Sequence, residues 1–437
     1  MARSKAFFLS TGVVIGVVSV IGALTLFARP VIAQSAAVYS WGSSSNGGPD
    51  CGSSACPSPQ QLSPPLGKVS SLDAANSFNL AITNKTTVKS WGQNDCGQLG
   101  DGNTTPTDSV VPVLGLSGVI ATATGEGSAI ALTSGGAVYT WGHLNYGTAA
   151  DPTDCSTCSP ACYSATPTQV MSLSGVQAVA AGGKHFYALL QSGAVMAWGD
   201  NTYGELGDGT TTSSSSPAAV DLPSPAMAIS SGNIFGDALL SNGELMTWGD
   251  NDFGQLGNPN VDSACNTNPN DTSWCSYVPV PVLNSSGMPL QGVTAISAGG
   301  DVKANGHNLA LLTGGTVMAW GDNESGQLGN PSVTGICNPS DPVQKSLNPE
   351  NMCTDVPVAV MGLPDIECMP DIQCIAAGGE HSMALSMDGD LYTWGDNSSG
   401  QLGDGTKTNE MLPEMVLTGV SEMAAGSKHS IALSTSS

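Results

Sequence analysis

Hydrophobic and polar residues alternate in short runs from residue 37 almost to the end of the chain. Runs such as "TVMAW" and "HSMAL" place apolar side chains at every second position, which is typical of strands with one buried face. Glycine, asparagine and proline separate the runs and predict tight turns. No segment beyond residue 33 keeps the period of a helix. We therefore expect an all-β fold.

One strand phrase, which ends in Trp-Gly, occurs seven times. Successive copies lie 50 to 74 residues apart, as expected of a repeat array with insertions. A second phrase, built around Ala-Gly-Gly and a short apolar run, precedes every copy after the first and occurs once more at the end. Seven of the eight tryptophans belong to the first phrase: Trp41, Trp91, Trp141, Trp198, Trp248, Trp320 and Trp394.

A third run, rich in proline and valine, follows the Gly-Gln-Leu-Gly turns. Each unit then contains four strands: the Pro-Val strand, the strand before Ala-Gly-Gly, the strand after it and the Trp-Gly strand. Such a unit cannot bury both faces alone, but sheets stacked around a ring do so and hide most edges. We expect a seven-bladed β-propeller of four-stranded antiparallel blades, with glycines such as Gly326 and Gly329 allowing tight turns between blades.

The two chain ends are out of phase by one phrase. Residues 37–42 form a Trp-Gly strand without an upstream partner, and the last Ala-Gly phrase has no Trp-Gly strand after it. We therefore expect the ring to be closed by the N-terminal strand pairing with the C-terminal strands within residues 412–434.

The stretch "AAGGEHSMALSMDGDLYTWGDNSSGQLGDG" (residues 376–405) resembles the repeat of the regulator of chromosome condensation family. The resemblance extends over roughly residues 37–434 and implies a seven-bladed propeller. The founding member of the family works in the nucleus on a small GTPase and chromatin, and a secreted bacterial β-lactamase inhibitor protein shares the repeat type. A shared fold alone does not specify function.

The formal charge is −24, and no arginine occurs beyond residue 33. Such a surface repels phosphate backbones, so we expect no nucleic acid partner. The N-terminus has Arg3 and Lys5, then an uncharged run over residues 6–28 and small residues up to Ala33. This pattern predicts residues 1–33 to be a signal peptide or an uncleaved membrane anchor, with residues 34–437 as one secreted or cell-surface propeller. Membrane contact is expected only through an uncleaved anchor.

Twelve cysteines in an exported chain predict disulfides. Four of them, Cys96, Cys155, Cys158 and Cys162, have no obvious local partner, and four thiolates would also suit zinc. The export signal favours disulfides, and we expect no metal. We expect the remaining cysteines to form four local pairs: Cys51/Cys56, Cys265/Cys275, Cys337/Cys353 and Cys368/Cys374.

Alternating strand directions sort the connections onto two faces. We expect the long insertions to gather on one face and, with their cysteines, to form a binding surface; the alternative is tolerated drift. The insertions are residues 43–61, 148–166, 258–277, 301–306 and 330–355. Aromatic side chains on this face are either anchors for a partner or lids on the blades. These candidates are Tyr146, Tyr163, Tyr203, Phe253, Trp274 and Tyr277.

Nothing in the sequence assembles a catalytic site. Four of five histidines occupy the Ala-Gly-Gly turn, where a structural hydrogen bond is expected: His185, His307, His381 and His429. The Asp-Asn pairs before the Gly-Gln-Leu-Gly turns lack the spacing of a calcium loop and favour turn bracing. We expect a monomeric, exported protein-binding scaffold without catalytic residues or a cofactor. The alternatives are an extracellular hydrolase or lyase with a carboxylate-lined central site, and nucleotide exchange on a small GTPase.

Overall fold

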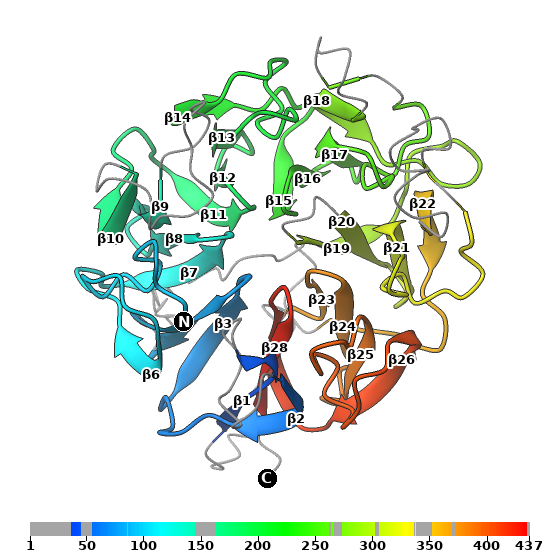
Figure 1. The fold of residues 1–437 in the computed structure, drawn as a ribbon. Helices are drawn as coiled ribbons and strands as arrows, with labels where there is room; N and C mark the ends of the chain where they lie inside the picture. Colours follow the sequence, from blue (N-terminus) through cyan, green and yellow to red (C-terminus); the bar gives the residue numbers. More distant parts are fainter. Residues whose placement is uncertain are drawn as a thin grey trace, which may run out of the picture.

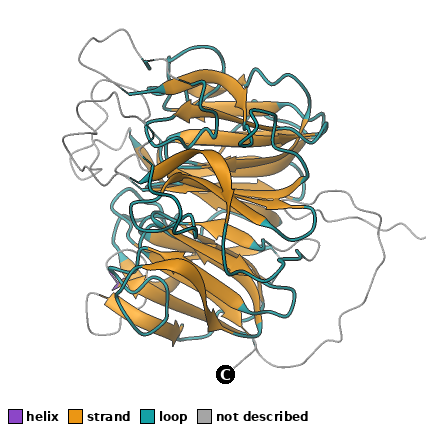
Figure 2. Ribbon diagram, turned by 90° about the vertical axis from the view of Figure 1, so that its right-hand side faces the viewer, coloured by secondary structure: helices purple, strands orange, loops and turns teal. Residues whose placement is uncertain are grey.

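The computed structural model describes residues 36–44, 55–84, 86–144, 162–261, 264–265, 273–301, 306–335, 337, 352–368 and 373–434. These residues form 28 strands in seven four-stranded antiparallel sheets, and the sheets stand around a central opening (Figure 1). Figure 2 shows the ring from the side, with the strands running between two faces that carry the connecting loops. The seven-bladed β-propeller is confirmed. Among the described residues no helix is long and apolar enough to cross a bilayer.

The blades are numbered in the order of their innermost strands. Blade 1 holds β3 (Val69–Ala74), β4 (Phe78–Thr83), β5 (Thr87–Gly92) and β6 (Thr107–Pro112); blade 2 holds β7 (Val119–Thr124), β8 (Ser128–Thr133), β9 (Val138–His143) and β10 (Tyr163–Gln169); blade 3 holds β11 (Val176–Ala181), β12 (His185–Leu190), β13 (Val195–Gly199) and β14 (Ser214–Ala219). Blade 4 holds β15 (Ala226–Ser231), β16 (Phe235–Leu240), β17 (Leu245–Asp250) and β18 (Cys275–Pro281); blade 5 holds β19 (Val293–Gly300), β20 (Gly306–Leu312), β21 (Val317–Asp322) and β22 (Cys353–Ala359). Blade 6 holds β23 (Ile375–Ala377), β24 (His381–Leu385), β25 (Leu391–Gly395) and β26 (Glu410–Leu417); blade 7 holds β27 (Val420–Ala425), β28 (His429–Ser434), β1 (Ala37–Ser43) and β2 (Ala55–Gln61).

The hydrophobic core lies between neighbouring blades. Leu80 and Val88 of blade 1, for example, pack in one cluster with Val119 and Trp141 of blade 2. Because each strand turns alternate side chains to opposite faces, every sheet supplies one apolar face to each neighbour. The ring is therefore held together by its blade boundaries.

Blade 7 closes the ring with strands from both chain ends. β1 pairs with β28 from Ala37 opposite Ser434 to Gly42 opposite His429, which confirms closure by the N-terminal strand. The expectation that residues 412–434 supply the other three strands is wrong, because residues 410–417 form β26, the outer strand of blade 6. β2 takes the outer place in blade 7, so each chain end contributes two strands.

The Gly-Gln-Leu-Gly turns join the third and fourth strands of one blade, and not one blade to the next as expected. The turn of blade 5 reaches down between blades 5 and 6, where Leu328 is fully buried. Gly326 and Gly329 have positive φ values of 86° and 64°, as the tight turn requires. A Cβ on Gly329 would also collide with Val360 and Trp394. The glycines therefore serve both the turn and its insertion between blades.

Candidate functional site

The strand directions define a loop face and an opposite face. The loop face carries the connections between first and second strands and between third and fourth strands; the opposite face carries the hairpins between second and third strands and the links between blades. All five predicted insertions fall on connections of the loop face, as expected. Large parts of them, 45–54, 145–161, 266–272 and 338–351, lie outside the described residues.

The Asp-Asn pair braces the turn that follows it. In blade 5, Leu328 N–H donates to Asn323 Oδ1 (3.0 Å), and Gln327 Nε2 donates to Asp322 Oδ2 (2.7 Å). Gln327 Oε1 in turn accepts from the N–H of Ser325 (2.9 Å). The bracing role predicted for the pair is confirmed. Burial raises the pKa of Asp322 to about 8, so this carboxyl is largely protonated at neutral pH.

The repeat tryptophan binds the turn of the preceding blade. Trp394 of blade 6 donates its indole N–H to the carbonyl of Gln327 in blade 5 (2.8 Å). This bond explains why the Trp-Gly and Gly-Gln-Leu-Gly phrases recur together, since one supplies the donor and the other the acceptor. The same bond joins Trp41 to Gln401 (2.7 Å), Trp141 to Gln98 (2.9 Å), Trp248 to Glu205 (2.8 Å) and Trp320 to Gln255 (3.0 Å).

The repeat histidines also join blades. His381 Nε2 hydrogen-bonds with Ser430 Oγ (2.9 Å), and Ser430 Oγ donates to the carbonyl of Gln401 (2.8 Å). Because the serine proton is directed to Gln401, Nε2 must be the protonated nitrogen, and Nδ1 has no partner among the described residues. Burial lowers the pKa of His381 to about 4, so the ring is neutral and structural.

The other three repeat histidines make equivalent bonds. His185 Nε2 meets Ser231 Oγ (2.9 Å), His307 Nε2 meets Ser382 Oγ (2.8 Å), and His429 Nε2 meets Asn79 Oδ1 (2.7 Å). Burial lowers their pKa values to about 4, 3 and 3 respectively. The structural role predicted for these histidines agrees with all four arrangements.

Four of the candidate aromatics lie on the loop face of blades 3 and 4: Tyr203 is in the turn of blade 3, and Phe253, Trp274 and Tyr277 belong to the turn and outer strand of blade 4. The turn that carries Tyr203 lies directly against β18. A Cβ added to the neighbouring Gly204 would collide with the backbone of Tyr277. The backbone of Trp274 makes two hydrogen bonds to the turn that carries Phe253. Its backbone N–H donates to Asp252 Oδ1, and its backbone carbonyl accepts from the N–H of Asn251, each at 2.7 Å. Tyr277 is 39% exposed, and the other three are partly buried.

The remaining two candidates are not part of this group of four. Tyr163 begins β10 in blade 2 and is partly buried; it pairs with His143. Tyr146 lies outside the described residues. We call Tyr203, Phe253, Trp274 and Tyr277 the aromatic rim.

The structure forms some of the predicted disulfides and not others. Cys337 is joined to Cys353 and Cys368 to Cys374, with Cα–Cα distances of 5.6 and 5.5 Å. Cys56, Cys96 and Cys162 are also disulfide-bonded. Cys51, Cys155 and Cys158 lie outside the described residues.

The predicted Cys265–Cys275 bridge is not formed: both are free, buried thiols. The Ala264–Trp274 bridge brings them side by side. Their mutual hydrogen bond and burial raise the pKa of Cys265, and Asp250 and Asp252 raise it further. The raised pKa lowers the share of thiolate, the species that forms disulfides, at Cys265.

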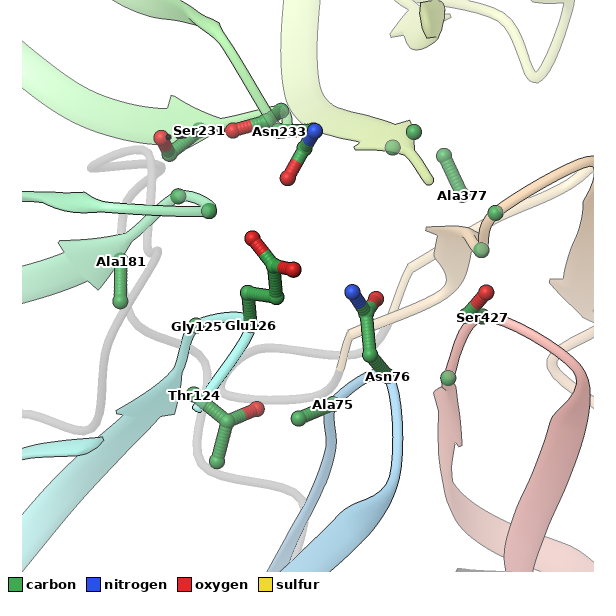
Figure 3. Close-up of a pocket in the computed structure, with 18 of the residues that line it drawn as sticks. Ala75, Asn76, Thr124, Gly125, Glu126, Ala181, Ser231, Asn233, Ala377 and Ser427 are labelled. Atoms are coloured by element: carbon green, nitrogen blue, oxygen red, sulfur yellow. Dashed lines mark hydrogen bonds between the residues drawn. The ribbon is translucent and has the colours of Figure 1, made fainter. Parts of the chain in front are cut away.

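The centre of the loop face is a cavity of about 80 Å³ at the mouth of the pore, lined by the turns between first and second strands of all seven blades. Glycine and alanine dominate the lining, because the blades approach each other closely here; a Cβ on Gly182 would collide with His185 and with Gly232 O. Figure 3 shows Glu126 pointing into the cavity between Asn76 and Asn233. Sequence reasoning missed this group, although Glu126 is visible as an acidic residue where other repeats have Gly, Asn or Ser.

In one place, a side chain of blade 3 makes the hydrogen bond that a side chain of blade 4 would otherwise make. Ser430 and Ser382 each donate to the turn of the preceding blade, but the equivalent residue of blade 4 is Gly236. Tyr187 of blade 3 fills the space: its OH donates to the carbonyl of Glu205 (2.5 Å) and accepts from Trp248 Nε1 (3.1 Å). The signal in the sequence was the pair of departures "HFYALL" and "FGDALL".

Comparisons with known proteins agree with this architecture. Human E3 ubiquitin-protein ligase HERC2 is 28% identical over 369 residues, which cover 82% of this chain but only 6% of HERC2. The ultraviolet-B receptor UVR8 of Arabidopsis thaliana is 26% identical over 368 residues, covering 82% of this chain and 72% of UVR8. The crystal structure of Prp20p from Saccharomyces cerevisiae superposes with a TM-score of 0.73 at 21% identity, covering 93% of each chain.

The repeat phrases themselves match a family profile. The regulator of chromosome condensation (RCC1) repeat profile matches residues 135–189, 192–236, 242–303, 314–385 and 388–433, together more than half of the chain. These segments contain five of the seven Trp-Gly strands, those of Trp141, Trp198, Trp248, Trp320 and Trp394. The chain is therefore a propeller scaffold that belongs to the regulator of chromosome condensation (RCC1) repeat family.

Proposed function

We propose that the chain is an exported scaffold that binds a partner protein through its loop face. The observation that carries the proposal is the aromatic rim, because Tyr277 is 39% exposed and three further aromatics lie on the loop face of the same two blades, 3 and 4. Tyrosine and tryptophan are enriched at the centre of protein interfaces. A rigid ring beneath them lowers the entropy lost on binding.

Other observations favour a protein partner with a basic surface. The formal charge of −24 attracts positive groups and repels nucleic acid. The fold relative Prp20p binds Gsp1p and histones, which are proteins. A hydrolase or lyase is less well supported, because Glu126 is the sole carboxyl group among the described residues lining the pore mouth, whereas acid–base catalysis needs a pair of groups.

Export is part of the proposal and is supported by the sequence of residues 1–33 and by the disulfides. Stable disulfides are typical of oxidising compartments outside the cytoplasm. N-terminal sequencing of the protein recovered from the envelope or the medium tests this part. A mature chain starting near Gln34 supports a cleaved signal, and an intact Met1 in the membrane fraction supports an anchor. Recovery from the cytoplasm contradicts export.

The experiment for partner binding is affinity capture from the native source with the full chain as bait. We expect a specific partner that is lost with the double variant Tyr203→Ser/Tyr277→Ser. The matched control is Met171→Ser/Met288→Ser, which removes exposed apolar side chains (81% and 62% exposed) from the opposite face. Capture that is unchanged by the first variant, or lost with the second, contradicts recognition through the aromatic rim.

A further inference from the structure

The turn of blade 3 carries a glutamate where the other described turns of this type carry glutamine. Glu205 Oε2 accepts from the N–H of Tyr203 (2.8 Å). The Oε1 of each glutamine accepts in the same way from the residue two positions before it, at Gln98 (2.9 Å), Gln255 (2.8 Å), Gln327 (2.9 Å) and Gln401 (2.9 Å). The second carboxyl oxygen of Glu205 therefore takes the place of the glutamine amide nitrogen.

That amide nitrogen has a fixed partner in blades 4, 5 and 6, where it donates to the aspartate of the Asp-Asn pair. The bonds are Gln255 to Asp250 (2.5 Å), Gln327 to Asp322 (2.7 Å) and Gln401 to Asp396 (2.5 Å). In blade 3 the aspartate is Asp200, so two carboxyl groups replace an amide and a carboxylate. Asp200 accepts instead from the hydroxyls of Thr202 (2.7 Å) and Ser213 (3.1 Å), and it is half-buried, whereas the other three aspartates are buried.

Glu205 is enclosed by the boundary between blades 3 and 4. It is 1% exposed, and its backbone carbonyl accepts from Tyr187 OH (2.5 Å) and Trp248 Nε1 (2.8 Å). The next residue, Leu206, is fully buried, and its N–H donates to Asn201 Oδ1 (2.9 Å). A charge on Glu205 therefore gains water only if the turn moves out of the boundary.

The titratable groups that face Glu205 are Asp200 on its own turn, Tyr187 on β12 and Asp250 on β17. His185 lies near Asp200, but burial lowers its pKa to about 4, so the ring is neutral at pH 7. Lys184 is joined to Asp200 through its backbone carbonyl, which accepts from Asp200 N–H (2.9 Å). Burial, and next the charge of Asp200, raise the pKa of Glu205 to about 8.

We propose that the Glu205 carboxyl is a proton-dependent switch for the turn that carries Tyr203. In its protonated form it stays between the blades and accepts from the N–H of Tyr203. In its ionised form it is a buried negative charge near that of Asp200, so the turn over residues 200–209 opens and lets water reach it. Opening separates Tyr203 from Tyr277 on β18. The effect on partner binding rests on the proposed function, whereas the opening of the turn does not.

The test is hydrogen exchange of the purified full chain, followed by mass spectrometry on peptides that cover residues 200–209. Rates at pH 6 and pH 9 are each divided by the intrinsic exchange rate at that pH. The open turn takes the ordinary glutamate pKa near 4.5, so protection is complete below that pH and is lost as the pH rises through 8. We expect the opening constant of the wild type to rise at least about tenfold from pH 6 to pH 9, which leaves the turn unprotected.

Glu205→Gln restores the amide donor opposite Asp200 and should reduce this rise to less than about threefold. The turn of blade 6, residues 396–405, is the internal control, because it has Gln401 opposite Asp396. Gln401→Glu should give that turn the pH dependence of the blade 3 turn. Glu367→Gln removes an exposed carboxylate from the link between β22 and β23 on the opposite face and should leave the blade 3 turn as in the wild type.

Two results overturn the switch: a wild-type turn that keeps its protection at pH 9, and an equal rise of the opening constant in Glu205→Gln and wild type. Affinity capture of the partner at pH 6 and pH 9 tests the link to binding. Loss at pH 9 with the wild type but not with Glu205→Gln supports that link. Unchanged capture by a wild type whose turn has lost its protection excludes Tyr203 from the binding surface, which contradicts the proposed function and leaves the switch standing.

Discussion

At the residue scale, Asp237 is a buried carboxyl group in a position made for an apolar side chain. It lies at the third residue of a second strand, where other blades hold Leu80, Ile130, Leu309, Met383 and Ile431. It is 1% exposed, and its Oδ1 has no hydrogen-bond partner within the described part of the chain. Burial raises the pKa of Asp237 well above its usual range.

Asp237→Leu should therefore stabilise the protein most at alkaline pH. A carboxyl whose folded pKa is raised contributes its full stability below its unfolded pKa and loses it as the pH rises through the folded value. We expect a gain of about 1–3 kcal/mol at pH 8, which shrinks towards pH 4. Urea unfolding at both pH values measures it. Asp237→Asn should flatten the pH dependence without the full gain, and a Leu variant less stable than wild type at pH 8 would contradict the argument.

The buried histidines predict the opposite dependence on pH. The pKa of His381 is about 4 in the folded protein and near 6.5 in the unfolded chain, so the unfolded state binds the proton first. Its effect on stability is absent above pH 6.5 and becomes unfavourable as the pH falls towards 4, by about 3 kcal/mol in total. His381→Asn should lose stability at pH 7 but show a weaker further loss on acidification than wild type.

The control for this prediction is Ser430→Ala. It removes the partner of His381 Nε2 but keeps the titrating ring, so it should lower stability while the acid dependence stays. Urea midpoints between pH 4 and 7 distinguish the two variants. An identical acid dependence in His381→Asn and wild type would show that His381 is not a source of the loss of stability at low pH. Comparing each variant with wild type at the same pH cancels the opposing titration of Glu422, whose pKa burial raises to about 8.

At the element scale, β12 and β16 depart from the repeat in a complementary way: β12 carries the bulky Tyr187, and β16 carries Gly236. The hydroxyl that blades 6 and 7 place on their own second strand comes here from Tyr187 of the preceding blade, and Gly236 leaves the room for it. A Cβ on Gly236 would collide with the Tyr187 hydroxyl, so the two residues depend on each other. Each departure from the repeat is therefore compensated by the other.

Gly236→Ser should destabilise the protein by about 1–3 kcal/mol through overpacking. Tyr187→Leu should cost about 2–5 kcal/mol through the cavity and the lost bonds. The double variant restores the side chains that blades 6 and 7 use, a serine beside an aliphatic residue, and should be more stable than the sum of the single changes by 1 kcal/mol or more. Denaturant titrations of all four proteins measure the coupling, and strict additivity would show that the pair is not compensatory.

The repeat phrases predicted the strands well but not the boundaries of the blades. Alternation and the recurring Trp-Gly identified the strands, because those features depend only on local period and turn chemistry. The sequence pattern groups the Pro-Val strand with the three strands that follow it, whereas it forms a sheet with the three that precede it. When four strand types repeat in a fixed order, that order alone does not show where one blade ends and the next begins. Which neighbour β26 joins depends on a long-range pairing, Gly395 opposite Glu410, that no local pattern specifies.

The candidate site was predicted unevenly for similar reasons. Tyr203 and Phe253 share a turn position in the repeat, so their common face followed from the register. The approach of the Tyr203 turn to Tyr277 depends on how that turn packs on the next blade, and the bond of Trp274 to the Phe253 turn depends on how the β17–β18 connection folds back on itself. Glu126 had no partner phrase to mark it, because a pore is formed only when the innermost turns of all seven blades meet.

At the scale of the whole molecule, the seam in blade 7 decides whether the ring is continuous. Its two halves are joined by the β1–β28 pairing, and Trp41 ties the N-terminal half to blade 6 by donating to the carbonyl of Gln401 (2.7 Å). The core of this boundary includes Val38 with Leu72 and Ile431, so blades 7 and 1 share apolar contacts across the seam. No covalent bond is needed for closure, but both chain ends must be present.

A circular permutant tests this arrangement directly. Ala37 lies opposite Ser434 in the β1–β28 pair, so a short turn can join the two ends without moving either strand. A permutant that begins at Ser63 and ends at Leu62 leaves every blade whole within one continuous chain, and we expect its melting temperature to match or exceed that of the natural order. Deleting residues 35–61 instead exposes β28 as an apolar edge and should lower the melting temperature sharply. A deletion as stable as wild type, or a permutant that fails to fold, would be incompatible with a ring closed by two strands from each end.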